Sequence, residues 1–289
     1  MEPLRRIAAI HDLSGVGKCS LTVALPVVSA SGVECSCMPT AVLSTHTGEF
    51  TGYTVHDLTE DMEPMARHWA REGVHFDGIY SGYLTNPEQV EVLERVIELL
   101  SGDGTMLIVD PVMADNGQYY TGFGERMCRA FQKLCERAEV ITPNVTEAAL
   151  LTGLPLPEKP PYGREYIEKL LRELKKLGPR VIAITGVHPD DSTGKIGMVA
   201  LDRSDGSVYT AFGPEREGLF FGTGDIFASA FAALLVRGAS VGQALDAAAG
   251  LVSDSIARSL NRELPRRFGV DFEGALPAYI RRVEAIFGE

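Results

Sequence analysis

Short apolar runs alternate with longer amphipathic stretches along this chain. Five runs have the length of a buried strand: "RRIAAI", "FDGIYSG", "TMLIVD", "AEVIT" and "RVIAIT", which begin at residues 5, 76, 105, 138 and 180. Stretches with a helical repeat lie between them. Continuous apolar runs that alternate with helices are typical of a parallel sheet covered by helices on both faces. The pattern therefore predicts an α/β chain.

The clearest helix is predicted over residues 164–178, "REYIEKLLRELKKLG". One face of this helix carries an apolar stripe made of Ile167, Leu170, Leu171, Leu174 and Leu177. Gly178 and Pro179 end the helix, because glycine and proline are typical of the residues that follow a helix. We expect the stripe to pack on the sheet and the charged remainder to face water.

The second half of the chain predicts a hairpin followed by helices. "KIGMVAL" and "VYTAF" are joined by "DRSDGS", which predicts two antiparallel strands near one edge of the sheet. Three helical stretches follow, "GDIFASAFAALLVRG", "VGQALDAAAGLVSDSIARSL" and "EGALPAYIRRVEAIFG", and the small residues of the first two favour close helix packing. The proline cluster at 154–163 is interpreted as a loop and not as a domain boundary. We therefore expect one domain over residues 1–289.

Charge and cysteine content exclude several classes of protein. The net charge is −12 over 289 residues, which argues against nucleic acid or an anionic membrane surface as a partner. The chain shows no apolar leader and no run of about 20 apolar residues that could span a membrane. Its five cysteines include no repeated Cys-x-x-Cys pair and are interpreted as reduced thiols, Cys19, Cys35, Cys37, Cys128 and Cys135. We expect a cytoplasmic protein with a small-molecule substrate.

The stretch "HDLSGVGKCSLT", residues 11–22, partly matches a phosphate-binding loop. Gly17 and Lys18 are in place, but Asp12 stands at the first glycine position and Cys19 at the hydroxyl position. A carboxylate there lacks the conformational freedom of glycine and repels phosphate. The match to a dinucleotide-binding loop is equally incomplete. We expect a strand, a glycine turn and a helix start that bind something other than nucleotide phosphate, so that Lys18 is dispensable for ATP.

The strongest chemical signal is "FFGTGDIFASAF", residues 220–231. Gly222 and Gly224 allow the backbone to approach a ligand, and the helix that follows directs its free N–H groups and its positive dipole end at the turn. Asp225 lies in the first helical turn, where it can accept a proton from a substrate hydroxyl. The alternative is that Asp225 only caps the helix.

Two further stretches place polar residues after apolar strands. Asp110 follows "LIV", and Thr142, Asn144 and Glu147 follow "EVI". Ligands of open parallel sheets bind at the carboxyl ends of the strands, so Asp110, Asn144 and Glu147 are expected to share a crevice with Asp225. Magnesium prefers oxygen ligands and keeps part of its water shell. The set favours metal-assisted phosphoryl transfer, although each residue alone can be a helix cap or a solvated loop residue.

Taken together, "GTGD", "DPVMAD", "TPNVTEA" and the first glycine turn resemble the ribokinase-like superfamily. Within it, "LSTHTGEFTGY", "IYSGYL" and "DPVM" look most like the pyridoxal/pyridoxamine (vitamin B6) kinases, over residues 5 to 260. The resemblance implies a three-layer α/β/α sandwich with a central, mostly parallel sheet. It implies ATP and Mg²⁺, a monovalent cation as a further candidate, and a homodimer. The implied reaction transfers the γ-phosphoryl group to the 5'-hydroxymethyl group of pyridoxal, pyridoxamine or pyridoxine.

The resemblance also implies roles for single residues. Asp225 would be the catalytic base, and Gly222, Thr223 and Gly224 would form the anion hole. Asp110 and Glu147 would work around the metal. The residues near the nucleotide phosphates would be Asn144, Glu147, Thr185 and Asp115.

The acceptor pocket is implied in the same way. The first-strand turn would address substituents of the pyridine ring through His11, Asp12 and Ser14, and the pocket would be completed by His46, Thr47 and Tyr83. The sequence departs from the better-known pyridoxal kinases at Asp12, where many carry serine. The preferred vitamer therefore stays open.

Two alternatives to a vitamin B6 kinase remain. A hydroxymethylpyrimidine kinase shares the glycine turn and "DPVM", but usually has cysteine at the position of Asp225. A non-catalytic sensor of small molecules would keep the pocket without turnover, and the intact Gly-Thr-Gly-Asp set argues against it.

Overall fold

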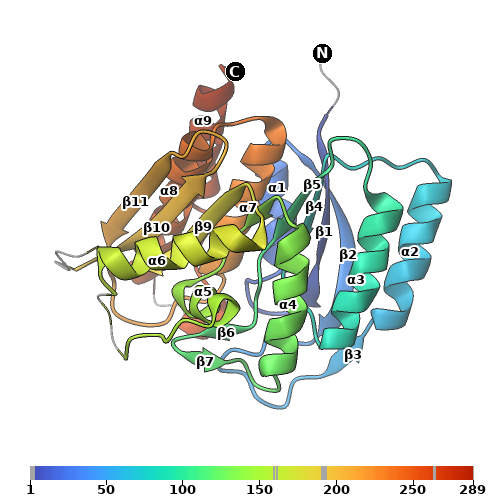
Figure 1. The fold of residues 1–289 in the computed structure, drawn as a ribbon, viewed down its shortest axis with the longest axis horizontal. Helices are drawn as coiled ribbons and strands as arrows, with labels where there is room; N and C mark the ends of the chain where they lie inside the picture. The colour runs from blue at the N-terminus through green and yellow to red at the C-terminus, as the bar shows by residue number, and fades with distance from the viewer. Residues whose placement is uncertain (1–3, 159, 161, 190–193, 263–264, 289) are drawn as a thin grey trace.

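The computed structural model describes residues 4–158, 160, 162–189, 194–262 and 265–288. Nine strands form one sheet: β1 (Arg6–Ser14), β2 (Glu34–Leu43), β3 (Val55–Asp57), β4 (Gly78–Ser81), β5 (Met106–Val109), β8 (Val140–Ile141), β9 (Val181–Val187), β10 (Lys195–Asp202) and β11 (Val208–Pro214). A separate two-stranded sheet consists of β6 (Ala114–Asp115) and β7 (Gln118–Tyr119). All five predicted strands and the predicted hairpin are present (Figure 1).

The large sheet is mostly parallel. Its strand order is β11-β10-β9-β8-β5-β4-β1-β2-β3. The strands from β9 to β2 pair in parallel, whereas β10, β11 and β3 are antiparallel at the two edges. The carboxyl ends of the central strands therefore all lie on the same side of the molecule, at the bottom of Figure 1.

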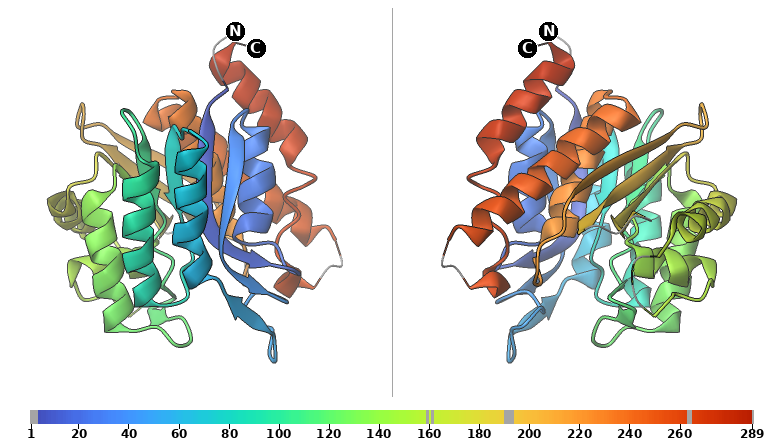
Figure 2. Two further views of the ribbon diagram at one scale, coloured as in Figure 1. Left: turned by 90° about the vertical axis from the view of Figure 1, so that its right-hand side faces the viewer. Right: turned by 90° about the vertical axis from the view of Figure 1, so that its left-hand side faces the viewer.

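Helices cover both faces of the sheet, as predicted. One face is packed by α1 (Leu21–Ala30), α7 (Thr223–Arg237), α8 (Val241–Leu260) and α9 (Leu276–Phe287). The other is packed by α2 (Thr59–Arg71), α3 (Pro87–Leu100), α4 (Glu125–Arg137), α5 (Val145–Thr152) and α6 (Arg164–Leu174). Figure 2 shows these two helical layers on either side of the sheet.

The side chains of β1 point alternately to the two faces of the sheet and so contribute to two separate hydrophobic clusters. Ile7 and Ala9 belong to the cluster under α7 and α8, and Ala8 and Ile10 belong to the cluster under α3 and α4. Successive side chains of a strand point to opposite faces, so a strand buried on both faces is apolar throughout. This explains the continuous run that predicted β1.

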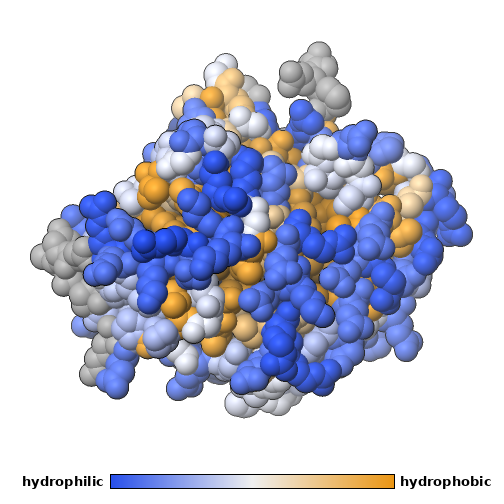
Figure 3. Space-filling view, in the orientation of Figure 1, coloured by the Kyte–Doolittle hydropathy of each residue, from blue (hydrophilic) through white to orange (hydrophobic). Residues whose placement is uncertain are grey.

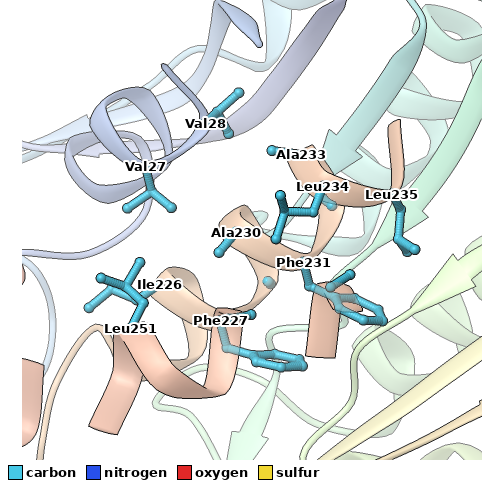
Figure 4. Packing of buried hydrophobic residues seen from close by; sticks show 14 of the residues in the cluster. Val27, Val28, Ile226, Phe227, Ala230, Phe231, Ala233, Leu234, Leu235 and Leu251 are labelled. Atoms are coloured by element: carbon cyan, nitrogen blue, oxygen red, sulfur yellow. The ribbon is translucent and has the colours of Figure 1, made fainter. Parts of the chain in front are cut away.

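Helix α7 lies at the centre of its layer. Its residues from Ile226 to Val236 are all buried, and Figure 4 shows Ile226 and Ala230 on α7 close to Val27 of α1 and Leu251 of α8. Alanine at many of the intervening positions lets neighbouring helices approach, as predicted from the sequence. A helix packed this firmly fixes the position of the turn at its N-terminus.

Helix α6 matches its predicted amphipathic character. Ile167, Leu170, Leu171 and Leu174 are buried, and hydrophilic residues gather along its outer face in Figure 3. The 3₁₀ turn Lys175–Leu177 ends at Gly178, which adopts a φ of 115°. Among the described helices, none is long and apolar enough to cross a membrane.

The predicted proline loop has no helix or strand in its described part, and residues 159 and 161 lie outside the described residues. The five cysteines are free thiols, as predicted.

Candidate active site

A cleft of about 1120 Å³ opens at the carboxyl ends of the parallel strands, beside the N-terminus of α7. Its wall contains the predicted site residues with the exception of His11: Asp12, Ser14, His46, Thr47, Tyr83, Asp110, Asp115, Asn144, Glu147, Thr185, Gly222, Thr223, Gly224 and Asp225. Their side chains come from segments far apart in the sequence. The expectation that Asp110, Asn144, Glu147 and Asp225 share one crevice is confirmed.

The N-terminus of α7 is built around Gly222. This residue caps the helix with a φ of 81°, and a Cβ atom placed on it would lie 2.0 Å from the backbone oxygen of Lys18. Only glycine fits here without strain. The Thr223 hydroxyl donates to the Phe220 carbonyl at 3.0 Å. The first amides of a helix have no acceptor within it, so those of the Gly222–Asp225 turn are available to an anion in the cleft.

Asp225 and Asp110 are two carboxylates of the cleft whose pKa values are raised. Burial raises the pKa of Asp225 to about 7, and the charge of Asp12 adds to this, whereas the Ser20 backbone amide lowers it. Burial and the nearby Asp225 raise the pKa of Asp110 well above its usual range, although the Thr142 hydroxyl donates to Asp110 Oδ1 at 3.0 Å. A pKa near 7 suits a general base at neutral pH, and a cation bound between the two carboxylates would relieve their repulsion.

Asn144 and Glu147 form a capping box at the start of α5. Asn144 Oδ1 accepts from the Glu147 amide at 2.9 Å, and Glu147 Oε2 accepts from the Asn144 amide at 2.9 Å. Glu147 Oε1 also accepts from the Met113 amide at 3.1 Å, and Asn144 Nδ2 donates to the Ala114 carbonyl at 2.8 Å. The alternative that these two residues are helix caps is therefore confirmed. Their contacts with nucleotide or metal remain predictions.

The donor set is compatible with a hydrated metal ion but not with a closed metal cage. Within the part of the chain that the structure describes, no group of three or more His, Cys, Asp or Glu side chains is arranged to hold a metal. Both Glu147 oxygens are already held by backbone amides. Asp110 accepts a described hydrogen bond on Oδ1 alone, from the Thr142 hydroxyl, and Mg²⁺ is usually held by one or two carboxylates together with water and substrate phosphates.

The other end of the cleft contains Asp12, Ser14 and Tyr83. Asp12 is 4% exposed, and its Oδ2 accepts from the Ser14 hydroxyl at 2.9 Å. Burial raises the pKa of Asp12 above its usual value. Tyr83 stacks on Phe123 with ring centroids 5.6 Å apart, and burial raises its pKa to about 12. This end combines a buried carboxylate with an aromatic wall, which suits a flat polar ring.

His46 lies on the wall, but both of its ring nitrogens are bound by backbone atoms. Nδ1 accepts from the Gly48 amide at 3.0 Å, so Nε2 carries the proton that is donated to the Arg267 carbonyl at 2.6 Å. The ring packs against Phe50 and Phe221. The contact predicted between His46 and the substrate can therefore be made only through the face of the ring.

His11 is not brought to the cleft, contrary to its predicted contact with the substrate. It is fully buried, lies edge-on to Tyr80 with ring centroids 4.3 Å apart, and has no hydrogen-bond partner on either nitrogen. Burial lowers its pKa to about 3, so the ring is neutral. The reason is that β1 continues to Ser14, so His11 is still a strand residue and points away from the face that exposes Asp12.

Lys18 does not line the described wall of the cleft. Its Nζ lies 2.7 Å from Glu273 Oε2, and its backbone amide donates to the Phe268 carbonyl at 3.1 Å. Its backbone oxygen lies under Gly222. The glycine turn that follows β1, called the first glycine turn, therefore supports the start of α7. Asp12 and Ser14 at the end of β1, and Cys19 after the turn, line the cleft.

Several wall residues were not predicted from the sequence. Cys19 and Ser20 lie near Asp225 and Asp12, and the segment between β11 and α7 contributes Arg216. Helix α8 adds Asp246 and Ser253. Cys19 and Ser20 lie in the glycine-rich stretch of residues 11–22, but no ligand contact was predicted for them. The last three belong to no recognisable motif, and only the packing of β11 and α8 beside α7 brings them to the cleft.

Comparisons with known proteins bear on the family and the fold. Residues 24–265 match the family model described as phosphomethylpyrimidine kinase. The chain is 35% identical to a Bacteroides thetaiotaomicron protein provisionally described as a phosphomethylpyrimidine kinase and solved with pyridoxal, with a TM-score of 0.90 over 96% of both chains. It is 33% identical to a pyridoxal kinase from Lactobacillus plantarum, with a TM-score of 0.86 over 98% and 99% of the two chains. A Bacillus subtilis hydroxymethylpyrimidine/phosphomethylpyrimidine kinase is 28% identical over 71% of this chain and 73% of its own length.

Proposed function

Because the chain belongs to the phosphomethylpyrimidine kinase family and is an ATP-dependent small-molecule kinase, we propose that it phosphorylates the 5'-hydroxymethyl group of a vitamin B6 vitamer. The observation that carries this proposal is Asp225, a carboxylate with a pKa of about 7 at the mouth of an anion-binding helix N-terminus. The relative solved with pyridoxal supports the choice of acceptor.

The proposed reaction uses groups on both sides of the Gly222–Asp225 turn. Asp225 accepts the proton of the acceptor hydroxyl group. The oxygen of that hydroxyl attacks the γ-phosphorus, and ADP leaves with the electrons of the broken P–O bond. The backbone amides of the turn stabilise the charge on the transferred phosphoryl group. Asp12, Ser14 and Tyr83 hold the ring of the acceptor. Thr185, Asn144 and Asp115 lie on the part of the wall that we assign to the nucleotide phosphates.

Mg²⁺ would be held by Asp110 and water, with Glu147 supporting the site through the backbone that it fixes. When bound, the ion neutralises charge on the phosphates. A monovalent cation, a homodimer and a cytoplasmic location remain predictions for this protein.

Replacing Asp110 by asparagine is expected to raise the Mg²⁺ concentration needed for half-maximal rate, with the melting temperature held within a few degrees. Glu147→Gln is expected to behave differently, because its new amide group would face backbone N–H groups that now meet a carboxylate oxygen. Leaving a buried donor unpaired costs roughly 1–3 kcal/mol, so this variant should melt at a lower temperature. Magnesium titrations and thermal melts of both variants test the assignment. An Asp110→Asn enzyme with unchanged magnesium dependence would argue against it.

A hydroxymethylpyrimidine kinase is the second candidate, favoured by the family description and by the Bacillus subtilis relative. An acceptor panel of pyridoxal, pyridoxamine, pyridoxine and hydroxymethylpyrimidine, under identical ATP and magnesium, separates the two by kcat/KM. We expect a vitamin B6 vitamer to be the best acceptor. A higher kcat/KM for hydroxymethylpyrimidine would reverse the assignment, and ADP release that no acceptor stimulates would contradict both.

A further inference from the structure

The cleft is strongly acidic for a site that receives a nucleotide. Carboxylates line it from Asp12 at the acceptor end, through Asp110 and Asp225, to Asp246 on α8. Along the described wall the only lysine or arginine is Arg216. Those carboxylates that are ionised repel a triphosphate, and a bound divalent ion offsets only part of their charge. Any cationic side chain that reaches the phosphates therefore has a large effect on nucleotide affinity.

The backbone on both sides of Arg216 is fixed, although the Arg216 side chain is exposed. The Glu215 amide donates to the Gly194 carbonyl at 2.7 Å, and Glu215 Oε1 lies 3.0 Å from His188 Nε2. The Glu217 carbonyl accepts from Arg266 Nη1 at 2.7 Å. Arg216 lines the cleft and makes no ion pair with a described carboxylate, so its guanidinium group is available to a ligand.

We propose that Arg216 binds the phosphate chain of the nucleotide, an assignment that rests on the proposed use of this cleft by ATP. Its segment joins β11 to the N-terminus of α7, where the proposed reaction places the transferred phosphoryl group. A planar guanidinium donates two parallel hydrogen bonds to phosphate oxygens, which lysine does not reproduce. The interaction discriminates nucleotides by their phosphates and not by their base.

Calorimetric binding of adenosine, ADP and a non-hydrolysable ATP analogue, all with Mg²⁺, tests this role without turnover. Charge-assisted hydrogen bonds to phosphate are worth roughly a ten- to hundredfold change in affinity. Arg216→Gln should therefore lower the affinity for the ATP analogue by about that factor. Adenosine should bind as it does to wild type, within about twofold. Arg216→Lys should lose part of the affinity, because it keeps the charge but not the planar donor pair.

Lys18→Gln is the matched control, since it removes the same charge from a residue that pairs with Glu273 outside the cleft. It should leave all three affinities unchanged. The proposal is overturned by an unchanged analogue affinity in Arg216→Gln, by an equal loss of adenosine affinity, or by an equal effect of Lys18→Gln. A wild-type enzyme that binds nucleotide but does not phosphorylate pyridoxal would contradict the proposed acceptor and leave this comparison intact.

Discussion

Asp225→Asn is expected to lower kcat with pyridoxal by about 10² to 10⁴, the usual contribution of general base catalysis. Asparagine keeps the size of the side chain and a hydrogen-bonding oxygen but cannot take the proton of the hydroxyl group. The KM for the acceptor should change far less, because Asp12, Ser14 and Tyr83 still line the pocket. Steady-state kinetics of wild type and variant at matched folding measure both quantities.

A purely structural Asp225 would give the opposite pattern, because asparagine caps helices about as well as aspartate. Kinetics would then be nearly unchanged, and a loss of less than threefold would remove Asp225 from the mechanism.

The melting temperatures of wild type and Asp225→Asn give a second comparison. Because the pKa of Asp225 is raised in the folded state to about 7, the stability it contributes is present at low pH and is lost as pH rises toward 7. At pH 8 the Asn variant should therefore be at least as stable as wild type.

The same pKa predicts how the rate depends on pH. Asp225 must be ionised to accept a proton, so kcat/KM for the acceptor should fall as pH is lowered below about 7 and level off above it. In Asp225→Asn the small remaining rate should lose this dependence. A wild-type profile that stays flat from pH 5.5 to 8.5 would show that another group accepts the proton.

The sequence predicted those strands whose residues are apolar on both faces, and it predicted the carboxylates that follow them. β5 and β8 are short and buried apart from Met106 at the start of β5, so Asp110 and Asn144 could be placed at one crevice from chain order alone. β2 was not among the five predicted strands, because "ECSCMPTAVL" mixes polar and apolar residues along a half-buried strand. β3 was not predicted, since all three of its residues are exposed at the edge of the sheet.

The site contacts that were missed depend on tertiary structure. The nitrogen atoms of His46 are bound partly by Arg267, which is 221 residues further along the chain. His11 was assigned to the pocket from its place in a motif. Because β1 continues past His11, the His11 side chain points away from the face that exposes Asp12. Arg216 lies in a segment with no motif, and only the hydrogen bonds of its neighbours hold it at the cleft. Sequence patterns identify the elements that carry a site more reliably than they identify where each side chain points.

Gly222→Ala is expected to damage both stability and turnover, and Gly238→Ala separates the two causes. Both glycines cap α7, and both have positive φ, 81° for Gly222 and 102° for Gly238. A Cβ atom on Gly238 would meet nothing within 4 Å, whereas one on Gly222 would lie 2.0 Å from the Lys18 backbone oxygen. Gly238→Ala therefore shows only the cost of a left-handed conformation, about 1–2 kcal/mol of the free energy of unfolding, and should keep its kcat.

Gly222→Ala adds a collision with backbone that cannot move aside as a flexible side chain can. The first glycine turn and the start of α7 must separate, and this displaces Asp12 and Ser14 on one side of the cleft relative to Asp225 on the other. A displacement of about 1 Å between reacting groups can cost on the order of 10²-fold in rate. We therefore expect a larger fall in melting temperature than for Gly238→Ala, and a kcat lowered by about 10² in the fraction that folds. If the two variants lost stability equally and both kept wild-type kcat, the close contact between Lys18 and Gly222 would have no part in aligning the acceptor with the base.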